Sequence, residues 1–182
     1  MGRSDEWHGG EIFKRYNYEM FPSHTYLDQI HIPYLTISFP PSTPKGASSV
    51  AIALGLKEHQ TIKTLIFEAD NGEQVLIMVG GDQNVISGHL KKVVGSRNIQ
   101  LASPEKVIQT TGYIIGSIPP FSWQPDGFRS FLDLDMMKET ILAVGAGVWG
   151  NEILITPVNL VNASRALVVN LTNREKPIFP QN

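Results

Sequence analysis

The sequence predicts one α/β domain, built on a mixed, mostly antiparallel sheet or barrel with helices packed outside. Expected strands outnumber expected helices, which favours a sheet-based core. The strongest local signal is a hairpin, in which two apolar strands at 62–69 and 74–79 flank Asp70-Asn71-Gly72, and Asn-Gly is a preferred residue pair for tight hairpin turns. The 182 residues, 42% hydrophobic and 18% charged, suit a single domain with a sizeable core.

Caps and periodicity place the other elements. Ser23 is expected to cap a helix that ends near residue 30, and Gly55 to end a helix over 47–54. Ser103 followed by Pro104 predicts another helix start. Two more helices are expected at 85–94 and from 157 to about 161, and further strands at 34–39, 99–102, 128–134, 141–144, 152–155 and 166–171.

The domain itself is expected to cover residues 23–172. Residues 1–22 are polar and aromatic with weak periodicity, so they are interpreted as an N-terminal extension, and 173–182 as a C-terminal tail. No apolar signal segment or membrane-spanning run is visible, which favours a cytoplasmic protein without a membrane partner.

The composition excludes several kinds of chemistry. There are no cysteines, which removes disulfides, thiolate nucleophiles and the usual structural zinc sets. The five histidines do not cluster with carboxylates, so no metal and no cofactor are expected. The formal net charge of -2 provides no global basic field, so an RNA partner would need a local patch or a grip on its end.

Lys63 is the most informative single residue. In the strand expected at 62–69, alternation places it on one face with Leu65 and Phe67, whereas Ile62 and Thr64 share the other face. An unpaired ammonium among apolar residues is costly, so Lys63 is expected to be paired, to lose its proton or to hold a ligand. The alternative is a lysine whose stem packs while its amine reaches solvent.

Two glycine-containing loops, 112–120 and 145–150, could form a preorganised wall. Glycine lets backbone N–H groups approach a ligand closely, and proline restricts a loop, so such a wall could polarise a carbonyl. The alternative is that both are merely tight connections.

Six short segments, in this order, resemble the YbaK/prolyl-tRNA synthetase-associated family of aminoacyl-tRNA deacylases and free-standing editing domains, over roughly residues 27–171. They are Pro41-Ser42-Thr43, Ile62-Lys63-Thr64-Leu65, Ala102-Ser103-Pro104-Glu105, Thr111-Gly112-Tyr113, Gly116-Ser117-Ile118-Pro119-Pro120-Phe121 and Val144-Gly145-Ala146-Gly147. The resemblance implies that fold and a trans-editing activity: hydrolysis of the ester that joins a wrong amino acid to the terminal adenosine of tRNA.

The resemblance also implies site roles. Lys63 matches the family's essential lysine, which holds the substrate end, and its amine is expected to point into a pocket between loops 116–119 and 145–150. Gly116 is the second implied catalytic residue, in the loop that orients the ester carbonyl, and no metal or covalent nucleophile is needed. Implied substrate-binding residues are Thr64, Ser117, Ile118, Pro119, Gly145, Ala146, Gly147 and Glu152.

The sequence departs from the family pattern around the pocket. Some members carry Ser where this chain has Gly145, some carry Asp at the position of Glu152, and others carry a histidine where this chain has Val148 and Trp149. The amino acid that is removed is therefore not readable from these residues. Two alternatives to a deacylase remain: a non-catalytic module that binds tRNA ends or a synthetase, and a hydrolase of small aminoacyl or nucleotide esters.

The expected partners are the acceptor end of aminoacylated tRNA and an aminoacyl-tRNA synthetase. Lys91, Lys92 and Arg97 form the best candidate basic patch for the tRNA backbone. The alternative is an ordinary solvated helix face.

Overall fold

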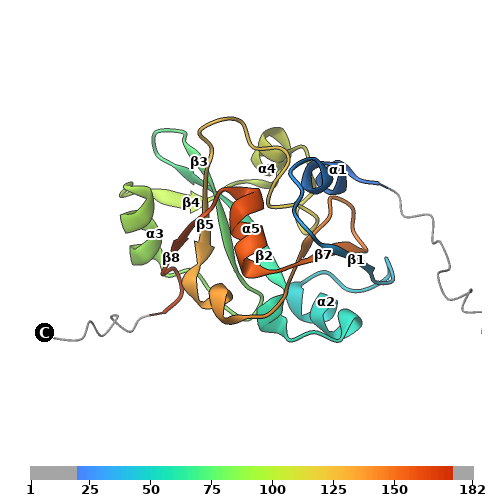
Figure 1. Ribbon diagram of the computed structural model, residues 1–182. Coiled ribbons are helices and arrows are strands. Elements are labelled where there is room, and N and C mark those ends of the chain that lie inside the picture. The colour runs from blue at the N-terminus through green and yellow to red at the C-terminus, as the bar shows by residue number, and fades with distance from the viewer. Residues whose placement is uncertain (1–19, 174–182) are drawn as a thin grey trace, which may run out of the picture.

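The computed structural model describes residues 20–173, so the expected extension up to residue 19 and the tail from residue 174 lie outside the described residues. Figure 1 shows the helices arranged around the strands. The α-helices are α1 (Pro22–Gln29), α2 (Ala47–Leu54), α3 (Ser87–Val94), α4 (Pro104–Thr111) and α5 (Pro157–Ser164), with 3₁₀ turns at Glu58–Gln60 and Leu134–Lys138. The strands are β1 (Leu35–Ser38), β2 (Ile62–Ala69), β3 (Gln74–Gly80), β4 (Ile99–Leu101), β5 (Arg129–Asp133), β6 (Leu142–Gly145), β7 (Asn151–Ile155) and β8 (Leu167–Val169).

The strands form two sheets. A three-stranded sheet has the order β1-β7-β6 and is antiparallel throughout, and a five-stranded sheet has the order β4-β2-β3-β5-β8. In the larger sheet β2 pairs antiparallel with β3 and β4, whereas β3–β5 and β5–β8 are parallel. The predicted mixed, mostly antiparallel α/β fold is confirmed.

Local signals placed most elements within a few residues. The hairpin turn lies at the expected position with Gly72 at φ 82°, and the Ser103 side chain accepts a hydrogen bond from the backbone N–H of Lys106 at the start of α4. The prediction that Ser23 caps α1 is wrong. Phe21 occupies the cap position with Pro22 first in the helix, and the Ser23 hydroxyl instead donates to the carbonyl of Ala146 at 2.6 Å.

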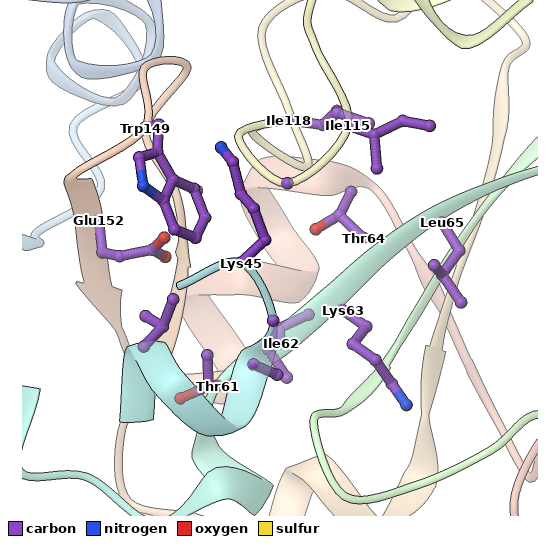
Figure 2. Close-up of a pocket in the computed structure, with 15 residues that line it drawn as sticks. Lys45, Thr61, Ile62, Lys63, Thr64, Leu65, Ile115, Ile118, Trp149 and Glu152 are labelled. Carbon is purple, nitrogen blue, oxygen red and sulfur yellow. The ribbon is translucent and has the colours of Figure 1, made fainter. Parts of the chain in front are cut away.

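Strand β2 separates two environments. Figure 2 shows Lys63 and Leu65 leaving one side of β2 and Thr64 leaving the other. We call the Thr64 side the front face and the Lys63 side the back face. Ile62 and Ile66 on the front face belong to the larger core cluster, and Leu65 and Phe67 on the back face pack against the smaller one.

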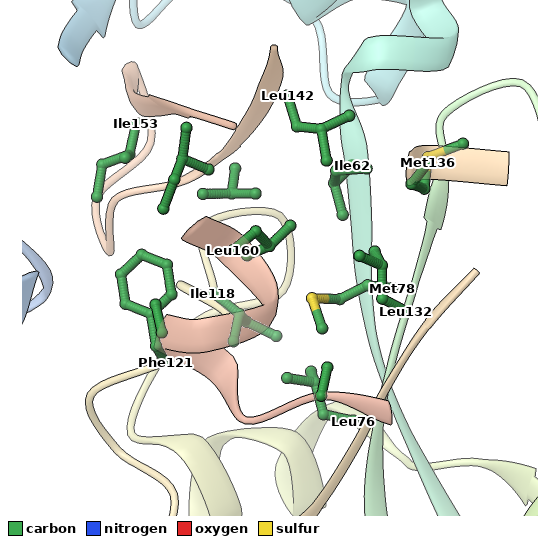
Figure 3. Packing of buried hydrophobic residues seen from close by; sticks show 14 of the residues in the cluster. Ile62, Leu76, Met78, Ile118, Phe121, Leu132, Met136, Leu142, Ile153 and Leu160 are labelled. Carbon is green, nitrogen blue, oxygen red and sulfur yellow. The ribbon is translucent and has the colours of Figure 1, made fainter. Parts of the chain in front are cut away.

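The larger cluster fills the space between the sheets. Figure 3 shows Ile62 and Met78 facing Leu160 of α5, with Ile118 and Phe121 of the loop before β5 closing the cluster. The smaller cluster lies behind the five-stranded sheet, where Leu90 and Val94 of α3 are buried. Because the two clusters pack against opposite faces of β2, the side chains in the first half of this strand have fixed directions.

Candidate functional site

A pocket of about 350 Å³ lies on the front side of the first half of β2. The start of α2, the loop before Phe121, and the ends of β6 and β7 complete its wall (Figure 2). The lining is mostly apolar with a few polar groups, which is the usual character of a small-molecule site. Its lining residues are Lys45, Gly46, Ala47, Val50, Thr61, Ile62, Lys63, Thr64, Leu65, Ile115, Gly116, Ile118, Gly145, Trp149 and Glu152.

The two glycine-containing loops lie against each other on one side of this pocket. A Cβ added to Gly145 would come within 2.9 Å of the backbone carbonyl carbon and oxygen of Ser117. A Cβ on Gly147 would come equally close to the Tyr113 ring. Any side chain at Gly145 would therefore push the 116–119 loop out of place, and glycine there allows the close contact.

Lys63 lines the pocket, but its amine does not point into it. The amine donates to the backbone carbonyl of Gln83, and Figure 2 shows the side chain directed away from Trp149 and Glu152. The expectation that the amine faces the pocket is corrected by this geometry. The physical reason is strand alternation, because Lys63 shares the back face with Leu65 and Phe67. Burial lowers the pKa of Lys63, while the nearby charges of Asp82 and Glu58 act in the opposite direction.

Two threonines give the pocket unsatisfied polar groups. The hydroxyls of Thr61 and Thr64 are buried and have no hydrogen-bond partner among the described residues. The N–H of Ala102 donates to the Ile66 carbonyl, which shows that the even-numbered residues of β2 direct their backbone groups toward β4. β4 pairs with β2 only from Phe67 onward, so the backbone of Thr64 is not paired with β4.

Glu152 is the acidic residue of the pocket. It lies on the central strand β7, opposite Gly145 of β6, and is 6% exposed. Within residues 20–173 no donor and no cation pairs with its carboxyl group. Burial raises its pKa to about 8. Figure 2 shows the carboxyl group directed toward the space beside Trp149.

Lys45 and Trp149 meet at the same pocket. The Lys45 amine lies 3.6 Å from the centre of the Trp149 ring, and the indole N–H donates to the carbonyl of Pro41 at 3.2 Å. Phe39 packs edge-on against the same ring, with 4.9 Å between ring centres. Among residues 20–173 the Lys45 amine has no acidic partner, so it remains available to an anionic group.

The remaining predicted residues take other places. Ser117, Pro119, Ala146 and Gly147 belong to the two loops but do not line the pocket. Figure 1 shows α3, which carries Lys91 and Lys92, on the opposite side of the molecule from α2, and Lys91 borders a separate hollow with Glu68 and Asp70. No role of any of these residues is tested by the geometry.

Sequence reasoning missed Lys45, Thr61 and Ile115 as pocket residues. Lys45 follows Pro41-Ser42-Thr43, one of the motifs that carried the resemblance, so its place beside a recognised motif was the available signal. Thr61 and Ile115 are brought in by the fold, and no local pattern marks them.

The family model for the aminoacyl-tRNA editing domain matches residues 43–163. The chain belongs to this editing-domain family, as the six motifs indicated. A solved structure of a candidate trans-editing enzyme for prolyl tRNA synthetase is similar with a TM-score of 0.75 and 26% identity, covering 84% of this chain and 95% of that one.

Curated relatives are proline–tRNA ligases. That of Streptococcus sanguinis is 38% identical over 108 residues, 58% of this chain and 17% of the ligase. That of Streptococcus thermophilus is 33% identical over 137 residues, 75% of this chain and 22% of the ligase. The chain thus spans less than a quarter of the length of these two relatives.

Residues 20–173 contain neither a candidate membrane span nor a cluster of metal-ligating side chains. No helix there combines the length and apolar character needed to cross a membrane. No group of three or more metal-ligating side chains is gathered there.

Proposed function

We propose that this domain hydrolyses the ester of mischarged aminoacyl-tRNA in trans, with tRNA for proline as the first substrate to test. The observation that carries the proposal is the pocket of the editing-domain family, walled by the two touching loops and containing unsatisfied polar groups. Similarity to proline–tRNA ligases and to a candidate trans-editing enzyme supports the choice of tRNA and an association with a synthetase.

Within this proposal the ester lies in the pocket. The 116–119 loop orients the carbonyl, and the positive φ of 94° at Gly116 lets that backbone turn beside Trp149. The Lys45 amine at the Trp149 ring is available to the phosphate of the terminal nucleotide. For Lys63 to hold the substrate end, as the family resemblance implies, its amine would have to leave the Gln83 carbonyl and turn toward the pocket.

The test is deacylation of a panel of mischarged tRNAs, compared with short aminoacyl-adenosines carrying the same amino acids. Ile115→Trp should fill the pocket from an exposed wall position and reduce hydrolysis by at least about tenfold, the order expected when reacting groups lose alignment. Ile108→Trp is the matched control, because both isoleucines are 49% exposed and Ile108 lies on α4 outside the pocket.

The outcomes separate the alternatives. Hydrolysis of tRNA esters that Ile115→Trp blocks and Ile108→Trp preserves would support the proposal. Binding of tRNA without hydrolysis of any ester would indicate a non-catalytic module, and equal hydrolysis of short esters and full tRNA would indicate a small-ester hydrolase.

A further inference from the structure

Two buried carboxyl groups within residues 20–173 have different surroundings. Among the described residues, Asp133 and Glu152 are the acidic side chains that are less than a tenth exposed. Asp133 is fully used by the fold, because its oxygens accept from the backbone N–H groups of Asp135, Leu171 and Thr172 and from the Thr172 hydroxyl at 2.7–3.0 Å. Glu152 has no such partner within residues 20–173.

An unpaired buried carboxyl group costs free energy, so the fold alone gives no reason for Glu152. A buried acid without donors either stays protonated or waits for a cation. Gly145 and Ile37 flank Glu152 on β6 and β1, and neither side chain offers a donor. The available partner is thus a ligand that enters the pocket.

The character of the pocket indicates which ligand this is. Apart from Lys45, Lys63 and Trp149, its polar side chains are hydroxyls and a carboxyl group. The Lys63 amine is directed to Gln83, and the Trp149 indole N–H to the Pro41 carbonyl. Hydroxyls and a carboxylate can all accept hydrogen bonds, and an ammonium offers three donors with a positive charge. The apolar remainder of the wall lowers the local dielectric, which strengthens a charge pair once it forms.

We propose that Glu152 binds the α-ammonium group of the aminoacyl ester, so that the site selects esters of amino acids over esters of acids that lack the amine. This inference rests on the proposed function. In this arrangement Glu152 holds the amine of the substrate at β7, while the ester carbonyl lies at the 116–119 loop. The raised pKa of Glu152 fits a carboxyl group that ionises when a cation arrives.

The experiment compares ligands that differ only in the amine. Adenosine 3′-esters of alanine and of propionate are assayed for hydrolysis, each rate divided by its uncatalysed rate in buffer. The enzyme should accelerate the alanyl ester at least about tenfold more than the propionyl ester, since a hydrogen bond to a charged group contributes on this order. Glu152→Gln should remove this preference, and Glu105→Gln, an exposed matched control, should keep it.

Binding tests the inference without catalysis. The non-hydrolysable 3′-alanylamido and 3′-propionylamido analogues of 3′-deoxyadenosine are titrated by calorimetry into the wild type and Glu152→Gln, whose fold is checked by thermal unfolding. Tighter binding of the alanyl amide that depends on Glu152 supports the assignment even if no ester is hydrolysed, in which case only the proposed function fails. Equal binding of both amides, or binding of neither, overturns the assignment, and so does an unchanged preference in Glu152→Gln.

Discussion

The two faces of β2 place polar groups under opposite conditions. On the front face the hydroxyl of Thr64 lies beside the pocket without a partner, whereas on the back face the amine of the adjacent Lys63 is occupied by the Gln83 carbonyl. At these two positions the front-face hydroxyl keeps hydrogen-bonding capacity for a ligand, whereas the back-face amine is held by the fold. Adjacent residues of one strand therefore have different roles, and a conspicuous charge need not mark the ligand side.

Replacement of Lys63 gives the largest expected effect and could break this comparison. If the Lys63 amine leaves the Gln83 carbonyl to hold the substrate end, Lys63→Ala should slow deacylation by roughly 10²–10³-fold, the scale of losing one electrostatic group, while the fold is retained. Lys63→Met, which keeps an apolar stem, should show the same loss if the charge matters. Single-turnover deacylation and thermal unfolding measure the two properties.

Two outcomes would change the interpretation of the back face. Normal hydrolysis by Lys63→Ala would remove Lys63 from the site and leave the chemistry to the front face. Unfolding of the variant would show that the bond to Gln83 is structural.

The pH dependence of Glu152 sharpens the description of the front face. Its pKa is raised from 4.5 to about 8, so the folded protein keeps a proton that the unfolded chain loses between these values. Folding stability contributed by this group is thus present below pH 4.5 and is lost as the pH rises to about 8, with a slope of up to about 1.4 kcal/mol per pH unit. Glu152→Gln should remove this loss.

The measurement is the free energy of unfolding in urea of the wild type and Glu152→Gln at about pH 5, 7 and 9. The variant should gain stability relative to the wild type as the pH increases. Parallel stability curves would mean that Glu152 is paired in solution, and the front face would lose its unsatisfied carboxyl group.

Gly145 tests whether the front face depends on the contact between the two loops. Gly145→Ala adds a Cβ 2.9 Å from the Ser117 backbone, which cannot move as a flexible side-chain end would. The expected cost is about 1–3 kcal/mol of unfolding free energy, the range for overpacking, together with weaker hydrolysis. Gly88→Ala is the control, because its added Cβ meets nothing within 4 Å. Equal melting temperatures for the two variants would contradict the close loop contact.

Local sequence signals predicted much of the fold because they act over a few residues. Ser103 with Pro104 started α4 and Gly55 ended α2 as expected, since caps depend on neighbouring backbone groups. Ser23 failed as a cap because its hydroxyl bonds to Ala146, 123 residues away. The parallel pairing of β3 with β5 is likewise a long-range feature that no short pattern encodes.

The candidate site was predictable only where motifs or alternation carried it. The six motifs led to the correct family and to Gly116 and Gly145 as residues that line the pocket, and the position of Glu152, where some family members carry Asp, added a third. Alternation already placed Lys63 with Leu65 and Phe67, but it could not say that the pocket would form on the opposite face. The face on which the pocket forms depends on where β6, β7 and the 116–119 loop pack, and this packing is set by long-range tertiary contacts.

The smallest expected effect on activity comes from changes on the exposed surface of α3, the helix that covers the back face of β2. Lys91 and Lys92 are exposed on α3, whose Leu90 and Val94 pack into the smaller core, and they are proposed to contact tRNA phosphates. Replacing both with Ala should weaken binding of every tRNA similarly and reduce the salt dependence by about one unit of slope per lost contact. A short aminoacyl-adenosine has no stem, so its hydrolysis should be unchanged. Affinity measured across a salt series decides the matter: an unchanged slope for full tRNA would confine RNA contact to other surfaces and leave the front-face pocket intact.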